Sequence, residues 1–168
     1  MGSTLTYLVY HVIFGTKRRE PIIIPEIRDD LYRYMGGIIK GEDATLLQIG
    51  GMPDHVHLVI QLKPIHTLSG LMQKLKGSSS KWMNKEKSLL GRFSWQDGYG
   101  AFTVSESQIP AVIHYVKEQE NHHKKITFSD EYILFLQRHN IDYDEQYLWT
   151  SVERRPFRTK YCRFSTGD

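Results

Sequence analysis

The chain has 168 residues, of which 40% are hydrophobic and 24% charged. This size allows one compact domain with a hydrophobic core and is too small for two comfortable ones. No apolar run approaches the roughly 20 residues of a membrane-spanning helix, and the single cysteine, Cys162, cannot form an internal disulfide. Met1 to Thr4 lacks the basic start and cleavage site of a signal peptide, so we expect a cytoplasmic protein.

The net charge of +3 is concentrated in one tail. Residues 151–168 hold five Lys and Arg side chains against two acidic ones, and the remainder of the chain is balanced. Phe157, Tyr161 and Phe164 interleave with these cations. Cations alternating with aromatic rings favour contact with a nucleic acid, through phosphates and stacked bases. A solvated tail that keeps the chain in solution is the alternative. The cations proposed to bind DNA are Arg154, Arg155 and Arg158.

The first predicted elements are a strand and a helix. Leu5–Phe14 is rich in β-branched and aromatic residues and predicts a strand buried on both faces. Lys17–Pro25 is basic and contains two prolines, which indicates a loop. Pro25 then opens a predicted helix that ends near Lys40, since apolar residues recur at helical spacing.

Two strands joined by a turn are predicted next. Ala44–Ile49 and Val56–Leu62 have strand character, and Gly50, Gly51 and Pro53 between them favour a turn.

The second half of the chain alternates helices with one short strand. A helix is predicted over His66–Trp82, a loop over Arg92–Gly100 and a strand over Ala101–Ser105. Ser107 is expected to cap a long helix that ends near Lys125, with Pro110 in its first turn. A last short helix is predicted over Glu131–Arg138.

This order of elements predicts an α+β fold, a ferredoxin-like βαββαβ antiparallel sheet with an added C-terminal helix. We divide the chain into a main domain, residues 1–128, and a C-terminal helix with the basic tail, residues 129–168.

The sharpest local feature is the triplet His55-Val56-His57 at the head of a predicted strand. Residues two apart in a strand point to the same face, so both imidazoles can reach one cation. Two histidines are an incomplete metal site, however, and such a pair also occurs by chance on exposed strands.

The predicted helix after Ser107 offers partners for the two histidines. Tyr115 and Gln119 are four residues apart and lie on one helix face, with His122 near the same line. Gln119 could supply an oxygen ligand and Tyr115 a nucleophile. Alternatively, both are ordinary surface residues. His123 is interpreted as a surface residue.

A tyrosine nucleophile would need help from a cation. With a pKa near 10, only about one phenol in a thousand is ionised at pH 7. A nearby metal ion favours the phenolate and neutralises charge on a scissile phosphate. Attack at phosphorus would leave a phosphotyrosine and a sugar hydroxyl, and this exchange can be reversed to reseal DNA.

Several motifs in consistent order resemble the HUH-type single-tyrosine transposases of small insertion sequences, the IS200-like family. They are YHVIFGTKRREPII, MPDHVHLVI, LMQKLKGSSSKW, WQDGYGAFTVS and the helix motif from Tyr115 to Gln119. The resemblance covers roughly Leu5 to Lys125.

The resemblance implies a function and a site. Such proteins cleave and rejoin single-stranded DNA near hairpins, use Mg²⁺ or Mn²⁺ and form a 5′-phosphotyrosine intermediate. They act as homodimers, in which the tyrosine of one subunit can serve the histidines of the other. By matching positions, His55, His57 and Gln119 are expected to bind the metal and Tyr115 to be the nucleophile. Lys17, Arg18, Arg19, Lys76 and Lys81 fall in segments that could contact DNA phosphates, and solvated surface charge is an equal alternative for them. His122 could contact DNA or support a metal ligand.

Three other functions remain open. A ferredoxin-like sheet also serves as a non-catalytic nucleic-acid-binding module. A metal-dependent phosphoesterase would use water as the nucleophile. A related HUH nickase in replication or plasmid transfer would share the first chemical step.

Overall fold

The computed structural model describes residues 3–86, 91–123, 125–144 and 148, apart from the side chain of His122. Four strands form one antiparallel sheet in the order β2-β3-β1-β4. The strands are β1 (Leu8–Gly15), β2 (Thr45–Met52), β3 (His55–Leu62) and β4 (Gly100–Thr103). This order and the intervening helices give the predicted ferredoxin-like arrangement.

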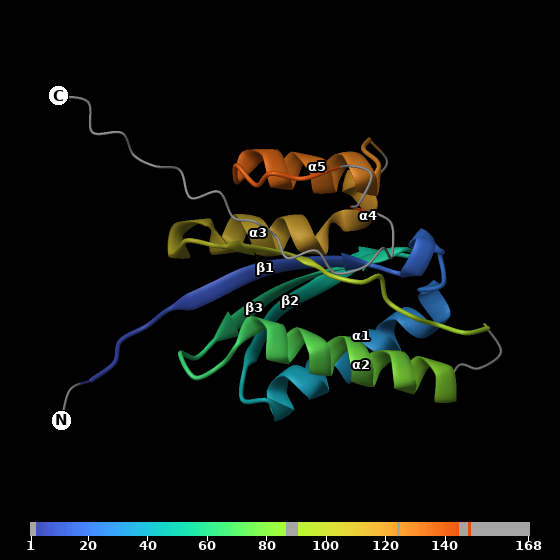
Figure 1. Ribbon diagram of the computed structural model, residues 1–168, viewed down its shortest axis with the longest axis horizontal. Helices are drawn as coiled ribbons and strands as arrows, with labels where there is room; N and C mark the ends of the chain where they lie inside the picture. Colours follow the sequence, from blue (N-terminus) through green and yellow to red (C-terminus); the bar gives the residue numbers. More distant parts are fainter. Residues whose placement is uncertain (1–2, 87–90, 124, 145–147, 149–168) are drawn as a thin grey trace.

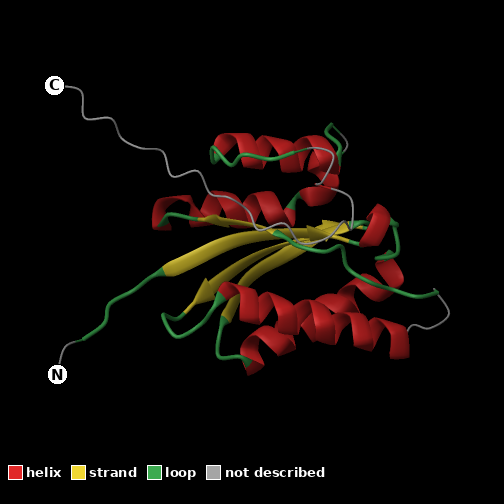
Figure 2. Cartoon of the chain, in the orientation of Figure 1, coloured by secondary structure: helices red, strands yellow, loops and turns green. Residues whose placement is uncertain are grey.

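Helices cover both faces of the sheet (Figures 1 and 2). One layer contains α1 (Pro25–Gly41) and α2 (Leu68–Glu86), and the other contains α3 (Ile109–Lys117), α4 (Gln119–His122) and α5 (Phe128–Arg138). Two 3₁₀ turns, η1 (Lys17–Arg19) and η3 (Glu106–Gln108), complete the described elements. No helix among the described residues has both the length and the apolar character needed to cross a membrane.

The alternation of side chains along β3 divides the core into two layers. Val56, Leu58 and Ile60 belong to the large cluster that packs against α1 and α2. Val59 packs with Val116 of α3 on the opposite face. Because side chains two apart share a face, His55 and His57 point to the side of α3 and α5. This is why β1 and β3 are buried on both faces, as the sequence predicts for β1.

The glycines between β2 and β3 lie in the sheet, which corrects the predicted turn. Gly50 pairs with His57 and Gly51 with Val56, so the connection contains only Pro53 and Asp54. A Cβ atom on Gly50 would lie 2.1 Å from the carbonyl oxygen of Val116. The missing side chain therefore lets α3 lie directly against β2.

The long helix predicted from Ser107 to Lys125 is interrupted, so that prediction was wrong in its extent. Ser107 lies in η3 rather than at a helix cap, and α3 ends at Lys117. Glu118 has φ −94° and ψ 22°, outside helical values, and α4 follows as a separate turn. The break redirects the chain so that Gln119 is buried instead of lying on an exposed stripe.

Candidate metal centre and tyrosine site

His55 and His57 are fully buried beneath the helices of the α3–α5 layer. Asp54, in the tight turn before β3, places its Oδ1 atom 2.7 Å from Nδ1 of His55. The ring of Phe128, the first residue of α5, stacks on the His55 ring at 4.0 Å between centroids. Side chains from a turn and a helix therefore fix the orientation of this imidazole.

His57 is held by a second buried histidine, which was not among the residues predicted for the site. Nε2 of His11, on the neighbouring strand β1, lies 2.9 Å from Nδ1 of His57. Burial, together with the nearby His139, lowers the pKa of His11 to about 4, so this ring is neutral at pH 7. A polar residue inside the apolar run LVYHVIF was the available sequence signal.

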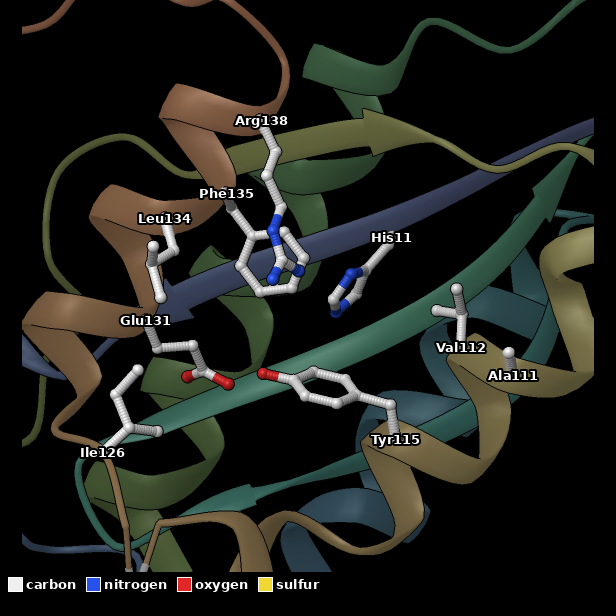
Figure 3. Close-up of a pocket in the computed structure, with 9 residues that line it drawn as sticks. All are labelled: His11, Ala111, Val112, Tyr115, Ile126, Glu131, Leu134, Phe135 and Arg138. Carbon is white, nitrogen blue, oxygen red and sulfur yellow. The ribbon is translucent and has the colours of Figure 1, made fainter.

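Tyr115 of α3 lies beside these histidines within the same chain. Its ring centroid is 5.9 Å from that of His57 and 6.1 Å from that of His11. Its hydroxyl points toward the carboxylate of Glu131 on α5 (Figure 3). The three side chains of Tyr115, His11 and Glu131 line a cavity of about 240 Å³, together with Phe135 and Arg138 of α5.

Gln119 lies close to the same place but contacts Glu131 rather than a histidine in the described contacts. Its side chain is buried, and Nε2 lies 3.5 Å from Oε1 of Glu131. Its carbonyl oxygen Oε1 is buried without a hydrogen-bond partner among the described residues. Because an unsatisfied buried acceptor costs about 1–3 kcal/mol, this oxygen is suited to a cationic ligand.

His123 and Glu131 join the two predicted histidines. The prediction that His123 is a surface residue was wrong: its side chain is 6% exposed, and its Nε2 atom lies 3.1 Å from Nε2 of His55. Glu131 is 3% exposed, and its Oε2 atom lies 3.0 Å from Nε2 of His123 and 3.4 Å from Nε2 of His57. Ligand atoms of all four side chains lie within 4.8 Å of one another.

The burial of these groups produces unusual acidities. Burial raises the pKa of Glu131 to about 8, and the nearby charge of Asp54 acts in the same direction. Burial also tends to raise the pKa of Asp54, but the hydrogen bond and charge of His55 outweigh it, so this pKa is lowered. Three imidazoles and a carboxylate that face one another suit a divalent cation, which would compensate for their missing hydration.

The cations predicted to contact DNA occupy different environments. Lys17, Arg18 and Arg19 are exposed in η1, at the same end of the sheet as His55, since the backbone N–H of Thr16 donates to the carbonyl of Asp54. The other members of the predicted set are distributed as follows: Lys81 is exposed on α2, His122 is in α4, and Arg154, Arg155 and Arg158 lie outside the described residues.

Lys76 is largely committed to the protein itself. Its Nζ atom donates to the carbonyl oxygens of Gln96 and Gly98 at 2.7 and 2.6 Å, and it lies over the ring of Phe14. Burial lowers the pKa of this ammonium to about 8. These contacts stabilise the loop that precedes β4.

Comparison with known proteins finds similarity to transposases. The family model described as "Transposase IS200 like" matches residues 4–119. The chain is 30% identical over 120 residues to the ISDra2 transposase TnpA of Deinococcus radiodurans, which covers 68% of this chain and 85% of that protein. It is 25% identical over 115 residues to the transposase for insertion sequence element IS200 of Salmonella typhimurium, covering 66% of this chain and 75% of the relative.

Solved structures agree with the fold. A crystal structure described as a putative transposase from Deinococcus radiodurans has a TM-score of 0.57 and 27% identity, and the match covers 71% of this chain and 95% of that one. A REP-associated tyrosine transposase bound to a REP hairpin has a TM-score of 0.55 at 11% identity, covering 75% and 76%, which supports the fold alone. The family match spans more than half of the sequence and includes both histidines of β3, Tyr115 and Gln119. The chain therefore belongs to the IS200-like transposase family.

Proposed function

We propose that this chain cleaves and rejoins single-stranded DNA through attack of Tyr115 on a phosphodiester, which forms a 5′-phosphotyrosine intermediate. The observation that carries the proposal is the position of Tyr115. Its ring lies 5.9 Å from that of His57, and its hydroxyl points toward Glu131, beside the histidine cluster (Figure 3). The hydroxyl thus faces a carboxylate beside two imidazoles, although much of the cavity lining is apolar.

His55 and His57 are proposed to hold a divalent cation, Mg²⁺ or Mn²⁺, with Gln119 as a further ligand. The buried Oε1 atom of Gln119 and the donor set around the histidines support this role. When bound, such an ion would lower the pKa of the phenol and neutralise charge on the phosphate.

The protein's own residues then position the reacting groups. The close packing of Val116 on Gly50 fixes α3, and with it Tyr115, against the sheet. The Tyr115 oxygen would bond to phosphorus as the bond to the 3′ oxygen breaks, and its proton would leave to solvent. The departing strand keeps a 3′ hydroxyl, whose attack in the reverse direction reseals the DNA. Arg138 lines the same cavity and would offer a cation to the phosphate.

The substrate is proposed to be hairpin-bearing single-stranded DNA, as the family resemblance implies. The REP-associated relative in the structural comparison is itself bound to a hairpin. The exposed cations of η1 lie at the same end of the sheet as His55 and would bind the DNA backbone there.

The arrangement supports attack within one chain. The sequence allowed Tyr115 to act either in its own subunit or in the partner of a homodimer. Here the distance of 5.9 Å between the rings of Tyr115 and His57 is already reached inside a single chain. We propose attack in cis, in a protein whose active unit can still be a dimer.

A non-catalytic module is the less favoured function. Such a module would bind nucleic acid on an open sheet face, but helices cover both faces of this sheet (Figure 2). The buried cluster of three histidines and a glutamate also has no use in that function.

A covalent-adduct assay tests the proposal. Untagged protein is incubated with Mn²⁺ and hairpin-bearing single-stranded DNA, labelled at either the 5′ or the 3′ end, and separated on a denaturing gel. We expect an adduct that carries only the 3′ label, is absent in Tyr115→Phe and is greatly reduced in His57→Ala. Tyr7→Phe, which changes a 53% exposed tyrosine, is the control and should form the adduct normally.

The other outcomes identify the alternatives. Cleaved DNA without an adduct would indicate a hydrolase that uses water. Binding without cleavage would indicate the module. An adduct that carries the 5′ label would contradict the proposed polarity.

A further inference from the structure

We propose that His123 and Glu131 are direct ligands of the same ion as His55 and His57, and that this nitrogen-rich set selects a transition metal such as Mn²⁺ or Zn²⁺ over Mg²⁺. The inference deepens the proposed function, because it assumes that this ion assists the tyrosine reaction. Both added residues lie beyond Gln119, where the family match ends.

The four side chains present their ligand atoms to one common point. Oε2 of Glu131 lies 3.0 Å from Nε2 of His123, 3.4 Å from Nε2 of His57 and 3.8 Å from Nε2 of His55. Ligands at roughly 2.0–2.2 Å from one ion would be separated by about 3.3–3.6 Å at tetrahedral angles and by about 2.8–3.1 Å at the right angles of an octahedron. An octahedral ion would keep two positions open for Gln119 and a phosphate oxygen. The distances of 3.0–3.8 Å from Oε2 of Glu131 to the three nitrogens are close to these ranges, so one ion could bind all four atoms after adjustment of the side chains.

The outer nitrogens of the three rings are already used. Nδ1 of His55 faces Oδ1 of Asp54 at 2.7 Å, and Nδ1 of His123 faces the carbonyl oxygen of Ile126 at 2.9 Å. Both partners are acceptors, so each Nδ1 carries a proton, and a metal ion would bind each ring through its inward Nε2 atom. In His57, Nδ1 is engaged by His11. Outer partners of this kind orient histidine ligands in metal sites.

The inward-facing ring nitrogens meet around the carboxylate of Glu131. The inward Nε2 atoms of His55 and His123 are 3.1 Å apart, and Nε2 of His123 also lies 3.0 Å from Oε2 of Glu131. A metal ion bound among these atoms would be held by both nitrogens and by the carboxylate at once.

Local contacts fix the chain segment that supplies His123 and Glu131. Thr127 caps α5 by accepting the backbone N–H of Asp130 at 3.3 Å, which places Glu131 in the first turn. Phe128 anchors the same turn by stacking on His55. Gln119 directs its amide toward the other carboxylate oxygen of Glu131 at 3.5 Å. The start of α5 is thus built around the centre.

The donor set determines the preferred ion. Mg²⁺ is a hard cation that prefers oxygen ligands and retains its waters, whereas imidazole suits zinc and other transition metals. Among divalent ions, affinity for one site rises from Mn²⁺ toward copper, with Zn²⁺ also high. We therefore expect Zn²⁺ to bind most tightly, then Mn²⁺, with Mg²⁺ weaker than Mn²⁺ by at least about tenfold.

Metal binding in the absence of DNA tests this assignment. Untagged, metal-free protein is titrated calorimetrically with MnCl₂, ZnCl₂ and MgCl₂. His123→Ala and Glu131→Gln should each weaken Mn²⁺ binding by at least about tenfold, since removal of even an outer partner of a ligand costs that much. His114→Ala and Glu106→Gln change exposed residues of the same types and should bind as the wild type does.

A spectroscopic measurement on the wild type tests the proposal even if one of the variants fails to fold. Electron spin echo envelope modulation of bound Mn²⁺ detects coordinated imidazole nitrogens, and three are expected. One or two nitrogens, variants with unchanged affinity, or equal binding of Mg²⁺ and Mn²⁺ would overturn the inference.

The adduct assay separates this inference from the proposed function. A three-imidazole ion without any DNA adduct would refute the tyrosine reaction and leave the metal assignment standing. A Tyr115 adduct with only two coordinated imidazoles would support the tyrosine reaction and refute the metal assignment.

Discussion

Nε2 of His11 on β1 lies 2.9 Å from Nδ1 of His57 on β3, so two adjacent strands are joined by paired imidazoles inside the core. The rings also stack, with centroids 5.1 Å apart. Because burial keeps His11 neutral, the pair introduces no extra charge into the centre. The contact orients Nε2 of His57 toward Glu131. His11 is therefore a positioning residue for the proposed ligand.

We expect His11→Phe, which keeps an aromatic ring but removes both nitrogens, to weaken Mn²⁺ binding by about 10–100-fold. The protein should remain folded, since the core position stays filled. Calorimetric titration without DNA gives the affinity, and circular dichroism verifies the fold. His114→Phe is the control, because the side chain of His114 is exposed on α3. Unchanged affinity in a folded His11→Phe protein would show that the contact does not position His57.

Attack in cis predicts the behaviour of mixed inactive proteins. Tyr115→Phe lacks the nucleophile and His57→Ala lacks a ligand, yet each retains the group that is missing from the other. If each chain uses its own tyrosine, a mixture of the two should form no more adduct than either variant alone. The measurement is adduct formation after the proteins are co-expressed or refolded together. Recovery of up to about a quarter of wild-type adduct, as random mixing of a dimer allows, would instead show that the tyrosine acts in trans.

The contact between Gly50 and α3 predicts a specific effect of one added methyl group. In Gly50→Ala the new Cβ would lie 2.1 Å from the carbonyl oxygen of Val116, so α3 must move away from β2. We expect a decrease of about 1–3 kcal/mol in the free energy of unfolding and a slower adduct reaction, because Tyr115 moves with the helix. Urea denaturation and the adduct rate provide the two readouts.

Gly77 provides the matched control for this substitution. It lies in the middle of α2, and a Cβ there would meet nothing within 4 Å. Gly77→Ala should therefore raise the free energy of unfolding by up to about 1 kcal/mol and leave the adduct rate unchanged. Equal effects of the two substitutions would refute the role of Gly50 in docking α3.

The acidity of Glu131 predicts how the stability of metal-free protein depends on pH. Its pKa is raised from 4.5 to about 8, so the folded state retains a proton that the unfolded state releases. The resulting stabilisation is complete below pH 4.5 and is lost as the pH rises through 8. The pKa of His11 is lowered from 6.5 to about 4, which has the opposite effect. Through His11 the free energy of unfolding rises with pH, but only below pH 6.5. Between pH 6.5 and 8 His11 contributes little, and comparison with Glu131→Gln removes the contribution of Lys76, whose lowered pKa is also about 8.

Urea denaturation in EDTA measures this effect. Relative to Glu131→Gln, the wild type should lose on the order of 1 kcal/mol of unfolding free energy per pH unit between about pH 6.5 and 7.5. Metal binding should show the opposite trend and tighten with pH, because the ion requires the carboxylate. A wild type and a variant with parallel pH profiles would contradict the raised pKa of Glu131.

Most of the fold could be predicted from local sequence patterns. The run that became β1 and the periodic residues of α1 lie where expected, because their hydrophobic patterns match their burial. Gly50 and Gly51 misled the prediction, because glycine also occurs where another backbone comes close. The break at Glu118 carries no glycine or proline signal, and it becomes visible only when α4 is seen to turn Gln119 inward.

Sequence patterns predicted only two of the four clustered side chains, His55 and His57. His55 and His57 are indicated by their strand spacing, whereas His123 stands in a His-His pair with no periodic context. Glu131 did leave a signal, because it lies on the apolar face of α5 between Phe128 and Leu136. A lone acidic residue on such a face cannot reveal its partners, since these come from β3 and from the turn after α4.

The exposed cations of η1 lie at the end of the sheet that carries His55. Lys17→Ala and Arg18→Ala should each weaken binding to hairpin-bearing single-stranded DNA and make its dependence on salt shallower, by about 0.7 in log–log slope for each phosphate that the protein no longer neutralises. Lys40→Ala is the control, since this exposed lysine lies in the last turn of α1 near the start of β2, at the opposite end of the sheet. Fluorescence anisotropy between about 50 and about 300 mM KCl, a range over which phosphate neutralisation dominates the affinity, measures the slopes. If Lys40→Ala changes the slope as much as Lys17→Ala does, the DNA is held by diffuse charge and not by η1.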